Sequence, residues 1–209
     1  MLSTLNSTRF VQLRKSIDSL KLQLLPKKFN ILGRYTELQV TKTKSFMLLV
    51  HAEIEYFIEE TVREKAIDSV RKFKEENIIS LSVVTLLGFL SKKNQTITET
   101  LRAGNTDIKD IQQRLDESLT IFLSTIESNH GIKNKNLLEL LLPVGIEESQ
   151  LDTVWINDMD GFGSDRGLFA HKSGSSYSTI KVINPEDVLS KVENLLIGLR
   201  ELDNSLLRI

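Results

Sequence analysis

The chain has 209 residues, with 27 lysines and arginines against 28 aspartates and glutamates, so its formal net charge is −1. This near-neutral balance does not indicate a general nucleic-acid binder, and a polyanionic partner would need a local basic patch. Cysteine is absent, which excludes disulfides and thiolate metal sites and is consistent with a reducing compartment.

We predict a single domain over residues 1–209, because the length supports one sizeable core and no proline-, glycine- or serine-rich linker divides the middle of the chain. The N-terminus lacks a charged-then-apolar signal pattern. The longest apolar run, near Ile78 to Leu90, is interrupted by polar residues and is too short to span a bilayer. These features predict a cytoplasmic protein with no membrane partner.

The N-terminal part of the chain has the apolar spacing of amphipathic helices. A first helix is predicted over residues 7–25, ended by Pro26. Residues 27–40 form a connector that could be briefly extended, and a long second helix follows from about Thr41 to Glu76. Its predicted apolar face consists of Phe46, Leu49, Val50, Ile54, Phe57, Ile58, Val62, Ala66 and Val70.

The middle of the chain alternates short helices with polar breaks. Residues 78–90 are apolar almost all round, which favours a buried helix and leaves a strand open. An amphipathic helix is predicted from Asp107 and stops at residues 128–131. Residues 136–142 form a leucine-rich helix that Pro143 ends.

Two further helices complete the predicted architecture. One opens at Glu147, and the last starts at residues 184–187, where a cap, a proline and two acidic side chains suit the positive end of a helix. No repeat or low-complexity tract appears, so we predict an all-α bundle with a long second helix and short accessory helices. The last helix is predicted to bury Val188, Val192, Leu195, Leu196, Leu199 and Leu202.

The segment 160–176 is the most distinctive part of the sequence, because Arg166 and His171 stand five positions apart among glycines and serines. A glycine- and serine-rich break follows them, which predicts that both lie near a helix terminus. The apolar helical positions that lead into this segment are Val154, Trp155, Met159 and Phe162.

On an ideal helix, residues five apart point about 140° away from each other, so Arg166 and His171 cannot meet on one regular helix. Either the helix is distorted at Gly167, or two copies of the segment meet in a composite cleft on a two-fold axis. The alternative without function is a surface arginine and a histidine favoured by the dipole at a helix C-terminus.

The remaining histidines give weaker signals. His51 and Glu55 share a face of the long helix and could pair, either as a functional group, as a solvent-facing ion pair or around a core histidine. His130 before Gly131 is typical of a helix end. The three histidines lack the close spacings of metal-binding helices, so we predict no metal site and no cofactor.

The run Arg166 to His171 resembles the Arg-x(4 to 6)-His signature of the HEPN superfamily, whose all-helical members include many bacterial toxins and defence ribonucleases. Three other pieces are similar to its RiboL-PSP-HEPN branch, and the resemblance covers about residues 45–199. These pieces are residues 48–55, residues 129–132 with 136–138, and residues 141–146.

The resemblance implies a metal-independent endoribonuclease, acting as a toxin or defence effector, with a composite active site in a homodimer. RNA carries its own nucleophile in the 2′-hydroxyl, His171 would move protons, and Arg166 would hold the phosphate oxygens. Many members have a polar residue where this chain has Gly167. Candidates for its role, and for other supporting roles, are Glu55, His51, Asp165 and Ser173.

The implied partners are the RNA substrate, a second copy of the chain, and an antitoxin or neighbouring regulatory protein. The rival interpretation is a non-catalytic HEPN-like module that binds RNA, a nucleotide or a partner protein, which Gly167 and the near-neutral charge favour. A third is a helical scaffold in which the motif is accidental.

Overall fold

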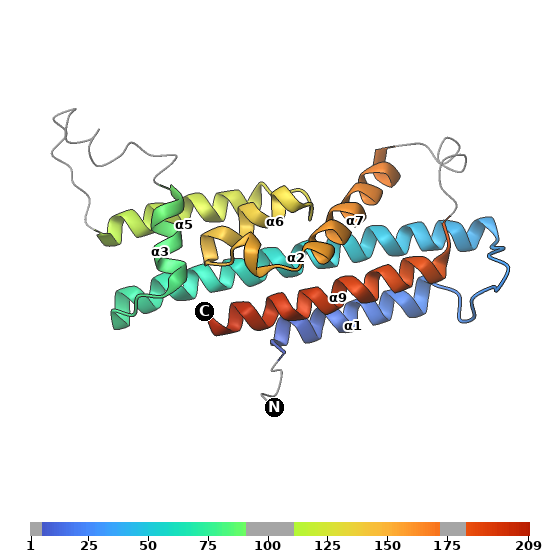
Figure 1. The fold of residues 1–209 in the computed structure, drawn as a ribbon, viewed down its shortest axis with the longest axis horizontal. Helices are drawn as coiled ribbons and strands as arrows, with labels where there is room; N and C mark the ends of the chain where they lie inside the picture. Colours follow the sequence, from blue (N-terminus) through green and yellow to red (C-terminus); the bar gives the residue numbers. More distant parts are fainter. Residues whose placement is uncertain (1–5, 91–110, 172–182) are drawn as a thin grey trace. The chain divides into compact units, whose positions relative to one another are not determined.

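The computed structural model describes residues 6–90, 111–171 and 183–209, with the backbone alone for residues 89–90 and 169–171. Within these ranges the chain is helical and contains no strand, so the all-α prediction is confirmed (Figure 1). The helices are α1 (Thr8–Leu24), α2 (Glu37–Glu76), α3 (Leu81–Leu90), α5 (Ile111–Glu127), α6 (Asn134–Leu141), α7 (Thr153–His171) and α9 (Pro185–Arg208), with 3-10 turns at Leu142–Val144 and Glu148–Gln150.

The described residues fall into two compact units. The first comprises residues up to 58, residues 131–135 and residues 151–204, and the second comprises residues 59–130, 136–150 and 205–209. Helix α2 continues from one unit into the other, and the single-domain prediction stays a prediction. No described helix is both long enough and apolar enough to cross a membrane.

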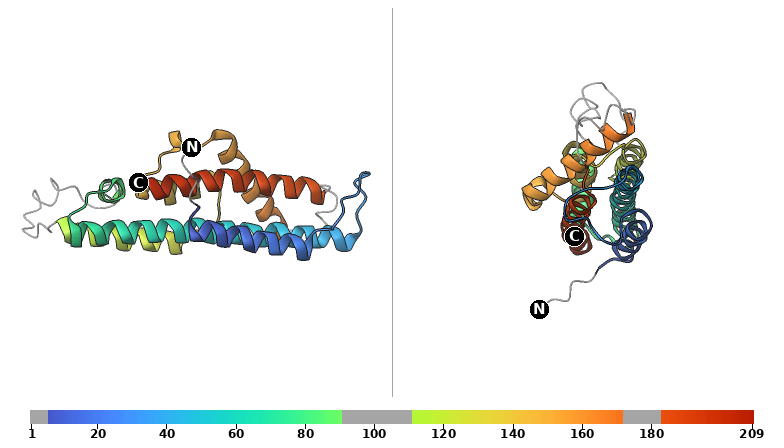
Figure 2. Two further views of the ribbon diagram at one scale, coloured as in Figure 1. Left: turned by 90° about the horizontal axis from the view of Figure 1, so that it is seen from below. Right: turned by 90° about the vertical axis from the view of Figure 1, so that its right-hand side faces the viewer.

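The first unit is built from α1, the first part of α2, α7 and α9. In it, α1 runs antiparallel to α9 and to α2, as Figure 2 shows. The hydroxyl of Ser7 caps α1 by accepting from the N–H of Phe10 at 3.0 Å and donates to the buried carboxylate of Asp203 at 2.6 Å. A Ser cap of this kind stabilises a helix by about 1 kcal/mol, and here it also joins the start of α1 to the end of α9.

The second unit holds α3 against the turn after α6. The Ser82 hydroxyl donates to the Val144 carbonyl at 2.8 Å, and the Thr85 hydroxyl donates to the Pro143 carbonyl at 2.9 Å. Gly145 has a φ of +93°, and a Cβ there would lie 2.9 Å from Cγ of Leu81. Only glycine combines this left-handed backbone with so close an approach.

Most predicted helix bounds agree with the structure within a few residues, but α7 begins at Thr153 rather than at Glu147. Glu148–Gln150 forms a separate 3-10 turn, and the Asp152 carboxylate accepts from the N–H of Trp155 at 2.9 Å, which caps the helix. The connector before α2 contains no strand. The predicted helix start at Asp107 lies outside the described residues.

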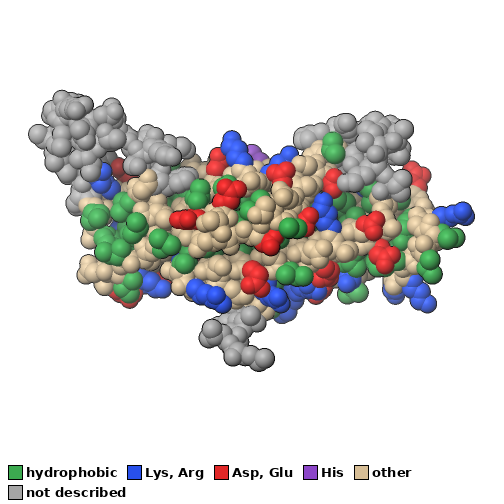
Figure 3. Space-filling view, in the orientation of Figure 1, with side chains coloured by type: hydrophobic (Ala, Val, Ile, Leu, Met, Phe, Trp, Pro, Cys, Tyr) green, Lys and Arg blue, Asp and Glu red, His purple; other side chains and the backbone are tan. Residues whose placement is uncertain are grey.

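Two predictions of burial were wrong. Leu49, placed on the apolar face of α2, is 46% exposed, whereas the other residues predicted for that face are buried. Helix α3 buries only one side, because Val83 and Leu86 are in the core while Val84 is 54% exposed. Figure 3 shows hydrophobic side chains gathered on the surface over α3 and the end of α2.

Candidate active site

One face of α7 carries a continuous stripe of side chains that packs into the core of the first unit. Trp155, Met159 and Phe162 are buried, at spacings of four and three positions. Arg166 follows four positions later and is half-buried, so it continues the same stripe at a place where an apolar residue would be ordinary. The charged member of the predicted pair therefore faces the interior of its own unit, while Val154, expected on the apolar side, is 69% exposed.

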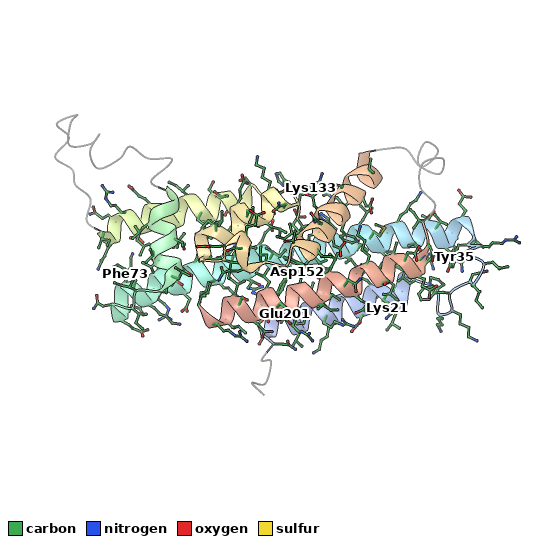
Figure 4. All side chains as sticks on the ribbon, in the orientation of Figure 1. Lys21, Tyr35, Phe73, Lys133, Asp152 and Glu201 are labelled. Atoms are coloured by element: carbon green, nitrogen blue, oxygen red, sulfur yellow. The ribbon has the colours of Figure 1, made fainter. Side chains whose placement is uncertain are left out.

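The first turns of α7 are held tightly against α9. The indole of Trp155 donates from Nε1 to the Leu195 carbonyl at 3.1 Å, and its ring lies directly on Gly198. A Cβ on Gly198 would collide with the indole. Further along α7, a Cβ on Gly163 would lie 3.1 Å from Cγ of Lys133, a residue that Figure 4 shows beside the helix. These contacts fix how α7 is rotated about its axis.

His51 of α2 packs against Phe162, the last apolar residue of this stripe. Its side chain is 2% exposed, and its ring is stacked on Phe162 with 6.3 Å between centroids and an interplanar angle of 20°. Its Nδ1 lies 3.5 Å from Oε2 of Glu55, whose side chain is 17% exposed. The histidine is therefore buried and not part of a solvent-facing ion pair, and a functional role for it stays a prediction.

The environment of His51 keeps the imidazole neutral. Burial lowers the pKa of His51, and the nearby positive charge of Arg166 lowers it further, from 6.5 to about 4. At pH 7 the ring therefore carries no charge, and its contact with Glu55 is not an ion pair. A neutral ring can lie beside a guanidinium without charge repulsion, whereas an imidazolium would oppose it.

Asp165, the residue before Arg166, contacts α9. It is buried, and its Oδ2 lies 3.4 Å from Nζ of Lys191. The same ammonium group lies over the ring of Phe162, 5.9 Å from the centroid. The middle of α7 is thus in contact with α2 through His51 and with α9 through Lys191.

Four of the predicted site residues therefore belong to one cluster in the first unit, namely Arg166, Asp165, His51 and Glu55. The backbone of α7 remains helical past Gly167 to His171, so a break at Gly167 is not observed. The pairing of two chains stays a prediction. The side chain of His171 and all of Ser173 lie outside the described residues.

The segment around His130 has a structural explanation in the second unit. The Asn129 amide donates to Oε1 of Glu59 at 2.7 Å and accepts from the Asn136 amide at 2.9 Å, while His130 itself is exposed. This chain of hydrogen bonds connects the turn after α5 to α2 and α6. Among the described residues, no three His, Asp or Glu side chains are grouped so that they could share a metal ion.

Sequence reasoning missed Lys191, although the sequence contains a signal for it. In α9 the positions that share the stripe facing α7 recur every three or four residues, and a lysine and a glycine interrupt the apolar pattern. The stripe is Val188, Lys191, Leu195, Gly198 and Leu202. Each interruption coincides with a specific contact, Lys191 with Phe162 and Asp165, and Gly198 with Trp155.

A protein-family model described as RiboL-PSP-HEPN matches residues 9–208. The match includes all of α9 and all but the first residue of α1, and so extends beyond the motifs visible in the sequence. No curated protein and no solved structure matches the chain.

Proposed function

We propose, from the premise that this chain belongs to the RiboL-PSP-HEPN family, that it is a metal-independent endoribonuclease acting as a toxin or defence effector. The observation that supports this most directly is the placement of Arg166. A half-buried guanidinium continues a buried apolar stripe beside a neutral histidine, at a place where an apolar side chain would be ordinary. An antitoxin or neighbouring regulatory protein would hold such an activity in check.

The reaction would use the nucleophile that RNA already carries. His171 would accept the proton of the 2′-hydroxyl, whose oxygen attacks the adjacent phosphorus, and a histidine would return a proton to the 5′-oxygen as the P–O5′ bond breaks. Arg166 would hold the non-bridging oxygens as their negative charge grows. The products would be a 2′,3′-cyclic phosphate and a 5′-hydroxyl end.

Two chains would be needed to bring an arginine and a histidine to the same phosphate. Since α7 is helical from Thr153 through His171, positions 166 and 171 of one chain lie about 140° apart around the helix axis. A homodimer with α7 from each copy at a shared cleft would supply two of each residue. Glu55, Asp165 and Ser173 remain candidates for the role that a polar residue at position 167 would have.

A local excess of positive charge supports an RNA partner despite the net charge of −1. Residues 26–44 contain five basic residues and one acidic residue. Lys27, Lys28, Arg34 and Lys42 are exposed there, and Figure 3 shows Lys and Arg side chains at the end of the first unit that carries the α1–α2 connection. Such a region could contact RNA phosphates without a basic protein overall.

The test is the substitution of each predicted catalytic residue. Arg166→Ala and His171→Ala should each reduce cleavage of a mixed RNA substrate in EDTA by about 100-fold or more, with unchanged circular dichroism. Matched controls are Arg71→Ala, which removes an exposed arginine, and His130→Ala, which removes an exposed histidine. If both site variants cut as fast as the parent, the assignment is wrong.

The second candidate function is RNA binding without cleavage, which the absence of a polar side chain at Gly167 favours. In the same assay this function predicts a stable complex of the parent protein with RNA and no cyclic-phosphate product. A labelled RNA measured both by anisotropy and on a denaturing gel distinguishes the two functions in one experiment.

A further inference from the structure

Lys191 approaches α7 from α9 at a single face of that helix. Its Nζ lies 3.4 Å from Oδ2 of Asp165 and 5.9 Å from the ring centroid of Phe162. A Cβ added to Gly161 would lie 3.4 Å from the same nitrogen. These three α7 residues lie within one turn of each other, so the ammonium group is held against the helix rather than extended into solvent.

Phe162 is the residue of α7 that α2 and α9 both contact, near the middle of the helix. His51 from α2 is stacked on its ring, and Lys191 from α9 lies over the same ring. Arg166 comes one turn later on the same stripe. The position of its guanidinium therefore depends on how firmly Phe162 and Asp165 are held.

A lysine is an unusual choice for this position in α9. Its side chain is 30% exposed and occupies the stripe between Val188 and Leu195, where an apolar residue would contribute to packing without desolvating a charge. The ammonium group makes the contact between α9 and α7 specific for one orientation of the helix. It attracts the Asp165 carboxylate and one face of the Phe162 ring, and so opposes rotation of this part of α7.

We propose that Lys191 is a positioning residue for Arg166. It holds Asp165 and Phe162 from α9, which keeps the guanidinium of Arg166 in register for a phosphate without contacting that phosphate itself. The inference rests on the proposed ribonuclease function, since positioning has an effect on catalysis only if Arg166 acts on RNA.

The kinetic test compares three substitutions. Lys191→Met keeps the length of the side chain and removes the charge, so kcat for RNA cleavage should fall about 10-fold, as expected for a small misplacement of a catalytic group, with KM unchanged. Lys191→Arg keeps both the ion pair and the ring contact and should restore most of kcat. The matched control is Lys21→Met, because Lys21 is also a half-exposed lysine, with Nζ 3.7 Å from Oε1 of Glu193 on the same helix α9.

A second measurement is independent of cleavage. Hydrogen exchange at the amides of residues 163–168 should be faster in Lys191→Met, and in Asp165→Asn, than in the parent or in Lys21→Met. Unchanged exchange, or a raised KM with unchanged kcat, would overturn the proposal. If exchange rises as expected but the parent never cuts RNA, the ribonuclease proposal fails while the contact between α9 and α7 stands.

Discussion

The two halves of helix α7 are held in different ways. In the first half, Trp155 packs on Gly198 with no room for another atom, and Phe162 is stacked on His51. In the second half, Arg166 is half-buried, and a Cβ on Gly167 would meet no atom of the described residues outside its own turn of helix within 4 Å. Both halves belong to one helix of one unit, and among the described residues the closest contact, between Trp155 and Gly198, belongs to the first half.

This difference suggests how the helix combines stability with chemistry. The packed half fixes the rotation of the helix, and the rotation determines that Arg166 faces α2 and the neutral ring of His51. Position 167, next to Arg166, has room for a small side chain among the described residues. Stability and function are therefore expected to respond to different substitutions along α7.

The first half of α7 should be the more sensitive to a methyl group added against it. Gly198→Ala places a methyl group inside the Trp155 indole, so α7 and α9 must separate or the tryptophan must change its rotamer. Overpacking of this kind should lower the free energy of unfolding by about 3 kcal/mol. Urea denaturation, followed by the fluorescence of the only tryptophan in the chain, measures the loss. A variant as stable as the parent would show that the close contact does not fix the helix.

Because His51 is buried and neutral, we predict a loss of stability in acid. The pKa of His51 is about 4 in the folded protein and 6.5 ordinarily, so the unfolded chain binds this proton more tightly. The contribution of the neutral His51 ring to the free energy of unfolding is then fully present above about pH 6.5. It is lost as the pH falls from there through 4, by about 2 to 3 kcal/mol. Urea denaturation at several pH values between 4 and 7 measures this change.

A pair of substitutions assigns that acid effect to a single residue. His51→Gln keeps a polar side chain that does not titrate, so the fall in stability between pH 6.5 and 4 should become smaller than in the parent. His130→Gln changes an exposed histidine in the other unit and should retain the full fall. An identical pH profile for the parent and His51→Gln would refute the assignment.

Position 167 should accept an added methyl group, whereas Gly198, which packs against the first half of α7, should not. Gly167→Ala makes the same chemical change as Gly198→Ala, but in the described part of the chain the new methyl group would meet no other segment. Alanine is preferred to glycine within a helix, so the free energy of unfolding should rise by about 0.5 to 1 kcal/mol. Thermal melting of the two glycine variants side by side tests the comparison, and a loss for Gly167→Ala would contradict the open environment described for it.

Much of the helical framework could be predicted from the sequence, because its signals are local. Pro185 with two acidic residues begins α9 where expected, and every residue predicted for its buried face is buried. The start of α7 was wrong, because residues 148–150 look helical in composition. They form a 3-10 turn that ends before Asp152 caps the helix. The spacing of apolar residues does not reveal which of two adjacent turns continues into the helix.

The site was only partly predictable, since its contacts join residues far apart in the chain. His51 and Phe162 are 111 positions apart, and no spacing within one helix indicates that their rings are stacked. Burial of His51 was one of several open alternatives, and Lys191 was missed because its partners lie on α7. The motif residue Arg166 could be found from sequence alone, but the neutral ring beside it could not.

The central claim is that Arg166 and His171 act together across two chains, and mixing two inactive variants tests it most directly. Purified Arg166→Ala and His171→Ala would be combined, allowed to exchange subunits, and assayed on RNA in EDTA. We predict that the mixture regains cleavage that neither variant has alone, because the mixed dimer contains one intact arginine and one intact histidine from different copies. A mixture that remains as inactive as its components, under conditions where the parent cuts RNA, would contradict the claim.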